Sequence, residues 1–224
     1  MERRECDPER LLVELGQAYA KAVIAGDEVA AEQAVRDAID ARLTTAQIDD
    51  EIIAPALWLV GRLWARGDIS VADEHLATEI SLRVLALQRE AQRTVRGREG
   101  RKVLLAAPEG EVHTVALQMI ANLLRDAGYT PLMLGGDVPL EALAESAVRH
   151  EPEVICLSAT MPSASDRLML AIHEIQKGWP AAGYLLGGRG VSPRLRPQPG
   201  IHLCRRVSEA VETADALVKR ADLN

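Results

Sequence analysis

The chain has 224 residues, and its apolar content of 48% is sufficient for one large domain or two domains of about 100 residues. Charged residues make up 26%, and the net charge of -7 argues against autonomous binding to a nucleic-acid backbone. Apolar runs are shorter than the roughly 18 residues of a membrane helix, and MERRECDPER lacks the apolar stretch of a signal peptide, so we expect a cytoplasmic protein without a membrane partner.

The first part of the chain has a helical pattern, because apolar residues recur every three or four positions without strand-like alternation. Thr44 with Gln47 forms a capping box, and Ser70 can cap the following helix. Four helices are expected, over about 7–26, 27–43, 44–67 and 70–93. The pattern therefore predicts a four-helix bundle as the first domain, residues 1–95.

The stretch RTVRGREGRK at residues 93–102 is polar and basic, and two glycines interrupt it. This composition predicts a linker between domains, and the acidic character of the whole chain favours a linker over a basic patch for nucleic acid. The second domain is expected to cover residues 96–224.

After this linker, short apolar runs alternate with helical segments, which is the pattern of βαβ units with a parallel sheet covered on both faces. Five runs are found, at residues 103–107, 131–134, 153–159, 182–188 and 201–204. They predict a flavodoxin-like, or Rossmann-like, five-stranded parallel sheet. Ligands of such sheets bind beyond the carboxyl ends of the strands, so the residues that follow each run are the candidates for a site.

Glu111 and His113 follow the first predicted strand, in the loop that leads to the next helix. A carboxylate two residues from an imidazole can accept one ring N–H, which fixes the tautomer and raises the basicity of the other nitrogen. Such an arrangement stands behind many metal-bound histidines. Taken alone, a histidine in such a loop is more often solvated than a metal ligand.

The wider spacing resembles the cobalamin-binding signature Asp/Glu-x-His-x-x-Gly, followed after 41 residues by Ser-x-Leu/Thr and after another 26 to 28 by Gly-Gly. Its three parts correspond here to Glu111-Val112-His113-Thr114-Val115-Ala116, Ser158-Ala159-Thr160 and Gly187-Gly188, with 41 and 26 residues between them. This resemblance implies that His113 replaces the cofactor's own base as the lower ligand of cobalt. It also implies that Glu111 accepts a hydrogen bond from His113 and that the nucleotide tail is buried beside the sheet.

The same resemblance places Ser158 and Thr160 against the buried tail, and it makes the glycine pair a point where backbone passes close to the ligand. A plain turn at the strand end is the alternative for Gly187 and Gly188. Arg189 could reach the amides or the phosphate of the cofactor. Ala116 stands where the family has glycine, and its added methyl group could shift or weaken binding of the tail.

In the helical domain, Trp64 ends the third predicted helix and Glu74-His75 begin the fourth. On the residues alone, Trp64 fits a core position and Glu74-His75 a solvated first turn. The spacing of Trp, nine residues and Glu-His, with Val71 seven positions after the tryptophan, resembles the light-sensing adenosylcobalamin-dependent repressors of carotenoid-synthesis genes. In that family the tryptophan shields the adenosyl group and the Glu-His pair contacts it. The resemblance implies that residues 1–95 cap the upper corrin face.

Two features depart from those photoreceptors. They usually begin with a winged helix-turn-helix domain, and only about seven residues precede the first predicted helix here, so we expect no direct binding to DNA. The family residue after the tryptophan is a histidine that ligates cobalt after photolysis. Here it is Ala65, which has no donor atom, and His75 is the nearest substitute.

We therefore predict a sensor without catalytic residues, which binds adenosylcobalamin between its two domains and uses His113 as the metal ligand. Light would break the cobalt–carbon bond and change an interface within a homo-oligomer or with a separate output protein. A corrinoid methyl carrier of a methyltransferase system, loaded with methylcobalamin, is the first alternative. A cobalamin storage or trafficking module is the second. The set Trp64, Glu74 and His75 is the feature that distinguishes the sensor from the methyl carrier.

Overall fold

The computed structural model describes residues 8–91, 100–192 and 198–221. The chain divides into two compact units, residues 1–93 and 94–224. The predicted boundary between residues 95 and 96 lies outside the described residues. Within the described ranges, no helix has both the length and the apolar character that crossing a membrane requires.

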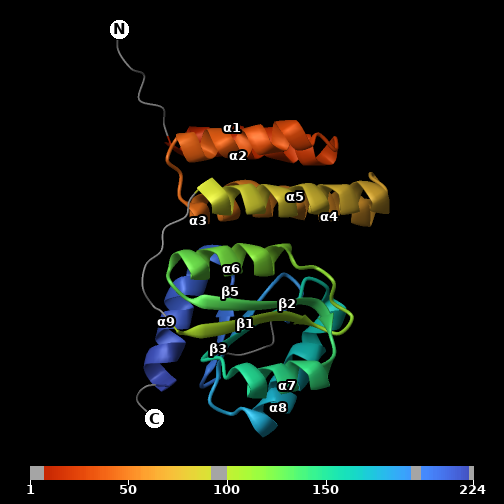
Figure 1. Cartoon of the computed structure of the whole chain (residues 1–224). Coiled ribbons are helices and arrows are strands. Elements are labelled where there is room, and N and C mark those ends of the chain that lie inside the picture. The colour runs from red at the N-terminus through yellow and green to blue at the C-terminus, as the bar shows by residue number, and fades with distance from the viewer. Residues whose placement is uncertain (1–7, 92–99, 193–197, 222–224) are drawn as a thin grey trace. The chain divides into compact units, whose positions relative to one another are not determined.

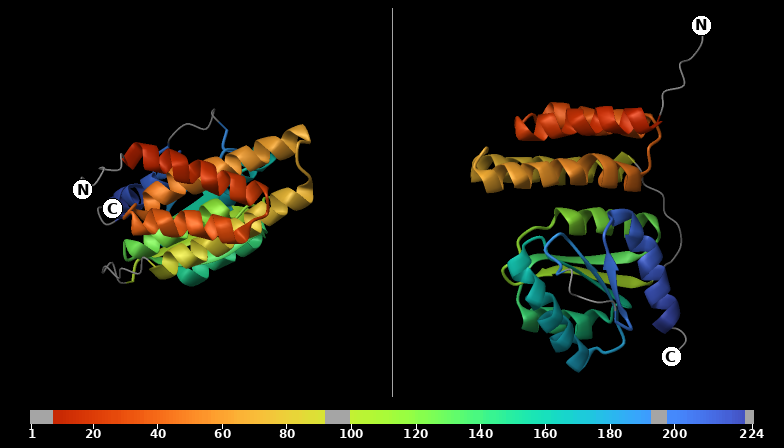
Figure 2. Two further views of the ribbon diagram at one scale, coloured as in Figure 1. Left: turned by 90° about the horizontal axis from the view of Figure 1, so that it is seen from above. Right: turned by 180° about the vertical axis from the view of Figure 1, so that it is seen from behind.

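The N-terminal unit is a bundle of helices. In chain order they are α1 (Pro8–Ile24), α2 (Glu28–Asp40), α3 (Thr45–Ile48), the π-helix η1 (Asp49–Ile53), α4 (Ala54–Arg66) and α5 (Val71–Ala91). Helices α1 and α2 form one layer and α4 and α5 a second (Figures 1 and 2). Val23, Ile52 and Ile80 are among the residues fully buried in this unit. The core also holds polar contacts, among them a hydrogen bond in which the Tyr19 hydroxyl donates to Ser81 Oγ at 2.9 Å.

The predicted helix ends are largely confirmed. Both hydrogen bonds of the capping box at Thr44 are present, and Asp27 caps α2 by accepting from Ala30 N at 3.0 Å. Ser70 accepts from Asp73 N at 3.2 Å at the start of α5. The third predicted helix differs from the expected regular helix, because a π-helical turn separates α3 from α4. In this turn the N–H of Ala54 donates to the carbonyl of Asp49, five residues earlier, and Pro55 follows directly in the first turn of α4.

The C-terminal unit has five strands, β1 (Lys102–Pro108), β2 (Thr130–Val138), β3 (Val154–Ser158), β4 (Gly183–Gly187) and β5 (Ile201–Cys204). All pairs are parallel, in the order β2-β1-β3-β4-β5. This order confirms the flavodoxin-like sheet.

The helices of this unit cover both faces of the sheet. On one side lie α6 (Val115–Asp126) and α9 (Ala210–Ala221), and on the other α7 (Leu140–His150) and α8 (Ser165–Gly178) (Figure 1). Short 3₁₀ turns, η2 (Pro162–Ala164) and η3 (Val207–Glu209), precede α8 and α9. Strand β3 is buried over its whole length, which explains why its sequence reads as a continuous apolar run rather than an alternation. Its last residue is Ser158, at the carboxyl edge of the sheet.

Candidate functional site

The β1–α6 loop holds a carboxylate–imidazole pair. Glu111 is completely buried, and its Oε1 contacts His113 Nδ1 and accepts from His113 N at 3.1 Å. Its Oε2 accepts from the backbone N–H groups of Thr160 at 2.7 Å and Met161 at 2.8 Å. Both donors follow β3, so the carboxylate ties the loop after β1 to the loop after the neighbouring strand.

These bonds also set the charge of Glu111. Burial by itself would raise its pKa, but the hydrogen bond with the His113 side chain and those from three backbone N–H groups hold the pKa below its usual value. The carboxylate is therefore ionised at neutral pH and favours a proton on His113 Nδ1. The imidazole, whose side chain is 36% exposed, is thereby prepared to use Nε2 as a metal ligand.

A buried hydroxyl lies at the carboxyl edge of the sheet, on the face covered by α6 and α9. Ser158 lies two residues after Cys156 in β3, so both side chains are on that face of the sheet. Ser158 pairs with Gly187 of β4, and Gly187 pairs with Cys204 of β5. Ser158 is 2% exposed, and its Oγ is without a hydrogen-bond partner among the described residues. A buried polar atom of this kind calls for a ligand group or a water molecule, and Gly187 beside it adds no side chain. The arrangement suits an inserted polar group such as a nucleotide tail.

Gly188 has an internal reason for being glycine. Its φ is +99°, and a Cβ there would overlap the carbonyl group of Ala159. The two segments are also joined by a hydrogen bond, in which Ala159 N donates to Gly187 O at 3.0 Å. The close approach that we expected for this glycine is therefore, first of all, an approach to the chain's own backbone. Gly187 differs, since among the described residues a Cβ there would meet the Cys204 carbonyl oxygen alone, at an ordinary contact distance of 3.5 Å.

The remaining predicted residues of the C-terminal unit lie around this edge. Thr114 is the N-cap residue of α6 and Ala116 lies in its first turn, both half-buried. Thr160 is half-buried, and it contributes its backbone N–H to Glu111. Arg189 follows Gly188 and is exposed.

The predicted residues of the helical unit lie about the α4–α5 turn. Trp64 is in the last turn of α4 and 41% exposed, and Gly67 ends the helix with φ +77°. In the first turn of α5, Glu74 Oε2 contacts His75 Nδ1 at 2.6 Å, and Glu74 Oε1 accepts from Thr78 Oγ1 at 3.2 Å. Val71, at the start of α5, is 53% exposed. The structure thus pairs Glu74 with His75, while convergence of Trp64 and the pair on one ligand stays a prediction.

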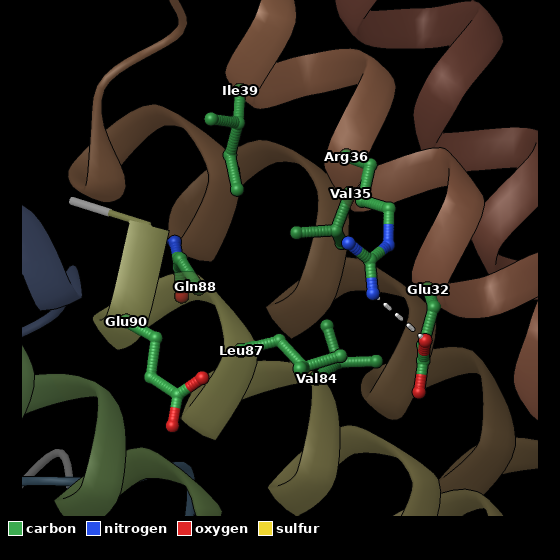
Figure 3. Close-up of a pocket in the computed structure, with 8 residues that line it drawn as sticks. All are labelled: Glu32, Val35, Arg36, Ile39, Val84, Leu87, Gln88 and Glu90. Carbon is green, nitrogen blue, oxygen red and sulfur yellow. Dashed lines mark hydrogen bonds and ion pairs between the residues drawn. The ribbon is translucent and has the colours of Figure 1, made fainter.

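A hollow of about 290 Å³ in the helical unit lies elsewhere, between α2 and α5. Figure 3 shows its lining, with Val35, Ile39 and Val84 beside Gln88 and the ion pair of Arg36 with Glu32. None of the predicted site residues lines it. It is therefore separate from the residues considered above.

Sequence reasoning missed the end of β2. Asp137 Oδ1 accepts from Gly110 N at 2.7 Å, and Asp137 N donates to Glu111 O at 2.7 Å. Gly136 packs against the same loop. The signal that could have found this contact is the Gly135-Gly136-Asp137 run at the end of an apolar strand, since glycines within a strand often mark a bulge or a close backbone approach.

Comparison with known proteins supports cobalamin as the cofactor. Models described as "B12 binding domain" match residues 15–87 and 101–217. The HTH-type transcriptional repressor CarH of Myxococcus xanthus is 27% identical over 168 residues, which cover 73% of this chain and 55% of that protein. The methanol–corrinoid protein of Methanosarcina barkeri is 26% identical over 162 residues, which cover 72% of this chain and 61% of that protein.

The alignments thus span less than two thirds of both curated relatives. Among solved structures, the monomethylamine corrinoid protein of Methanosarcina barkeri matches with a TM-score of 0.72 at 17% identity, covering 93% of this chain and 99% of that chain. At this identity the likeness shows the fold alone. Because the second family model covers more than half of the residues, the chain belongs to the B12 binding domain family.

Proposed function

We propose that this protein is an adenosylcobalamin sensor in which His113 is the lower ligand of cobalt. The observation that carries the ligand assignment is the Glu111 carboxylate, which is buried, ionised and in contact with His113 Nδ1. A fixed Nδ1–H leaves the lone pair on Nε2, which is the form a metal needs. Ser158 and Gly187 fit the nucleotide tail, because an unsatisfied buried hydroxyl stands beside a position without a side chain.

The sensor assignment depends on the helical unit. Trp64 has a large exposed apolar face, and the carboxylate of Glu74 orients the ring of His75. We assign these three residues, with Val71, to the upper corrin face, where they would cover an adenosyl group. Bound adenosylcobalamin would supply a cobalt–carbon bond that light can break. Similarity to the repressor CarH supports this assignment.

Ala65 limits what the helical unit can do after illumination. It follows Trp64 directly and has no atom that can bind a metal. The upper position would then hold water or His75, and no protein bond at residue 65 would lock the illuminated state. We therefore expect a weaker or more reversible switch than in relatives with histidine at this position.

Absorbance spectra and size-exclusion chromatography test the proposal. The protein should bind adenosylcobalamin in preference to methylcobalamin, and green light should change both the spectrum and the elution volume. Return of the dark elution volume after illumination is expected from Ala65. A complete change that persists in darkness would contradict the argument from Ala65, and His75→Ala would then show whether His75 forms the lock.

A methyl carrier is the second candidate function, favoured by the similarity to the methanol–corrinoid protein. In that case His113 and Glu111 keep their roles, and the output partner is a methyltransferase. Equal affinity for the adenosyl and methyl forms, with no response of the elution volume to light, would select the carrier over the sensor.

A further inference from the structure

Strand β2 departs from regular pairing at its carboxyl end, next to the loop that carries Glu111 and His113. Leu105 pairs with Met133, Ala106 with Gly135 and Pro108 with Val138, so β2 carries one extra residue at each of two steps. Gly135 and Asp137 adopt left-handed conformations, with φ +93° and +54°. A positive φ is natural for glycine and uncommon for aspartate, so the backbone at Asp137 is held in a less favoured conformation.

This bulge turns Asp137 toward the β1–α6 loop. Its Oδ1 accepts from Gly110 N and its own N–H donates to Glu111 O, both at 2.7 Å. The two bonds clamp consecutive residues of the loop from one side. On the other side, Thr160 and Met161 hold the Glu111 carboxylate. Glu111 is thus fixed through its main chain by β2 and through its side chain by the segment after β3.

Gly136 brings the two backbones close together. A Cβ at this position would lie 2.9 Å from Glu111 O and 3.0 Å from Val112 Cα. The distance to Glu111 O is shorter than real Cβ atoms show, so any larger residue would displace the loop. The placement of Glu111 and His113 therefore depends on the conformation of residues 135–137.

We infer that Asp137 is a positioning residue for His113, acting through the main chain of Gly110 and Glu111. The inference rests on the proposed role of His113 as the ligand of cobalt. Asp137 touches neither the imidazole nor the Glu111 carboxylate in the contacts described. Its side-chain oxygen and its left-handed backbone together keep the loop in the orientation in which Glu111 meets His113 Nδ1.

Two substitutions of Asp137 distinguish the contribution of its side-chain acceptor from that of its left-handed backbone conformation. Asp137→Asn retains a side-chain oxygen and tolerates positive φ, whereas Asp137→Gly tolerates positive φ even better and loses the oxygen. Glu109→Gln is the matched control, because it removes from the same loop an exposed carboxylate that pairs with Arg167 at 3.1 Å. Circular dichroism of each apo variant establishes folding before the measurements.

The first readout is the tautomer of His113 in the apo protein, from nitrogen chemical shifts of the ring. The second is the fraction of bound aquacobalamin that shows histidine ligation, together with its affinity. Asp137→Asn and Glu109→Gln should match the unmutated protein in both. Asp137→Gly should show mixed tautomers and about tenfold weaker binding, at the lower end of the effects of altering an outer partner of a metal ligand.

The inference would be overturned if Asp137→Gly had the His113 tautomer and the aquacobalamin affinity of the unmutated protein. It would also be overturned if Asp137→Asn changed both quantities as much as Asp137→Gly does. If Asp137→Gly does not fold, Gly136→Ala decides, since it keeps the acceptor and pushes on Glu111 O; an unchanged His113 tautomer there would refute the positioning role. If the unmutated protein binds aquacobalamin without histidine ligation, the proposed function fails. The tautomer series of the apo protein still decides the role of Asp137 in that case.

Discussion

Glu111 is completely buried and its carboxylate receives three backbone N–H groups, whereas Trp64 is 41% exposed and the His75 side chain 72% exposed. The C-terminal unit thus holds its candidate ligand in a geometry fixed by the sheet and its loops. The helical unit presents side chains that are free of such packing on much of their surface. His113 is therefore positioned before the cofactor binds, whereas Trp64 and His75 would be ordered by the bound cofactor. We expect the two groups of residues to respond differently to mutation.

The largest effect is expected at His113. His113→Ala removes the proposed ligand of cobalt, so its loss of affinity should exceed the roughly 10- to 100-fold change typical of removing an outer partner of a ligand. The histidine-ligated absorbance spectrum should disappear as well. His173→Ala, at an exposed position on α8, is the control and should change neither quantity. An unchanged spectrum in His113→Ala would remove the basis of the ligand assignment.

Gly188→Ala should show how rigid the carboxyl edge of the sheet is. Alanine at φ +99° costs about 1–3 kcal/mol in strain alone, and overlap with the Ala159 carbonyl adds to that cost. Gly100 is a matched control, because it also has φ +99° and a Cβ there meets no atom of the described residues within 4 Å. Chemical unfolding of both variants measures the difference. Equal destabilisation would mean that the edge relaxes around the added methyl group.

Ser158→Ala should change ligand binding and folding in opposite directions. Its buried Oγ lacks a partner among the described residues, so its removal should leave the apo protein as stable or more stable. Loss of a bond to the cofactor should weaken cobalamin binding by about 0.5–1.5 kcal/mol, roughly 2- to 10-fold. Calorimetry and thermal unfolding measure the two quantities, with the exposed Ser163→Ala as control. Weaker folding with unchanged affinity would assign Ser158 to the core instead.

Trp64→Ala should have a measurable effect only in the presence of ligand. Because Trp64 is 41% exposed, the apo protein should lose little stability. The preference for adenosylcobalamin over methylcobalamin should fall by about 0.5–1.5 kcal/mol, the range for aromatic stacking. Trp58→Ala on the same helix, 43% exposed, should leave that preference unchanged. If both variants behave alike, the adenosyl group does not lie against Trp64.

The two regions also differ in how much their sequence could reveal. Helix ends at Thr44 and Gly67 follow from local rules, because a cap or a left-handed glycine acts within one turn. The π-helical turn before α4 was not expected, since the sequence does not show whether Pro55 starts a new helix or follows a widened turn of an existing one. Exposure of Trp64 was likewise undecided, because a tryptophan in an amphipathic helix fits a core equally well.

By itself, the sequence determined the order of helices and strands, the parallel sheet and the spacing that joins Glu111-x-His113 to Ser158 and Gly187-Gly188. These signals are periodic or local, so they can be recognised in the sequence without knowledge of the structure. The tertiary structure alone decided that Glu111 binds Thr160 N, 49 residues away, that Gly188 faces Ala159 and that Asp137 clamps Gly110. Such contacts depend on strand register and on bulges, which place the ends of neighbouring strands side by side regardless of their separation along the chain.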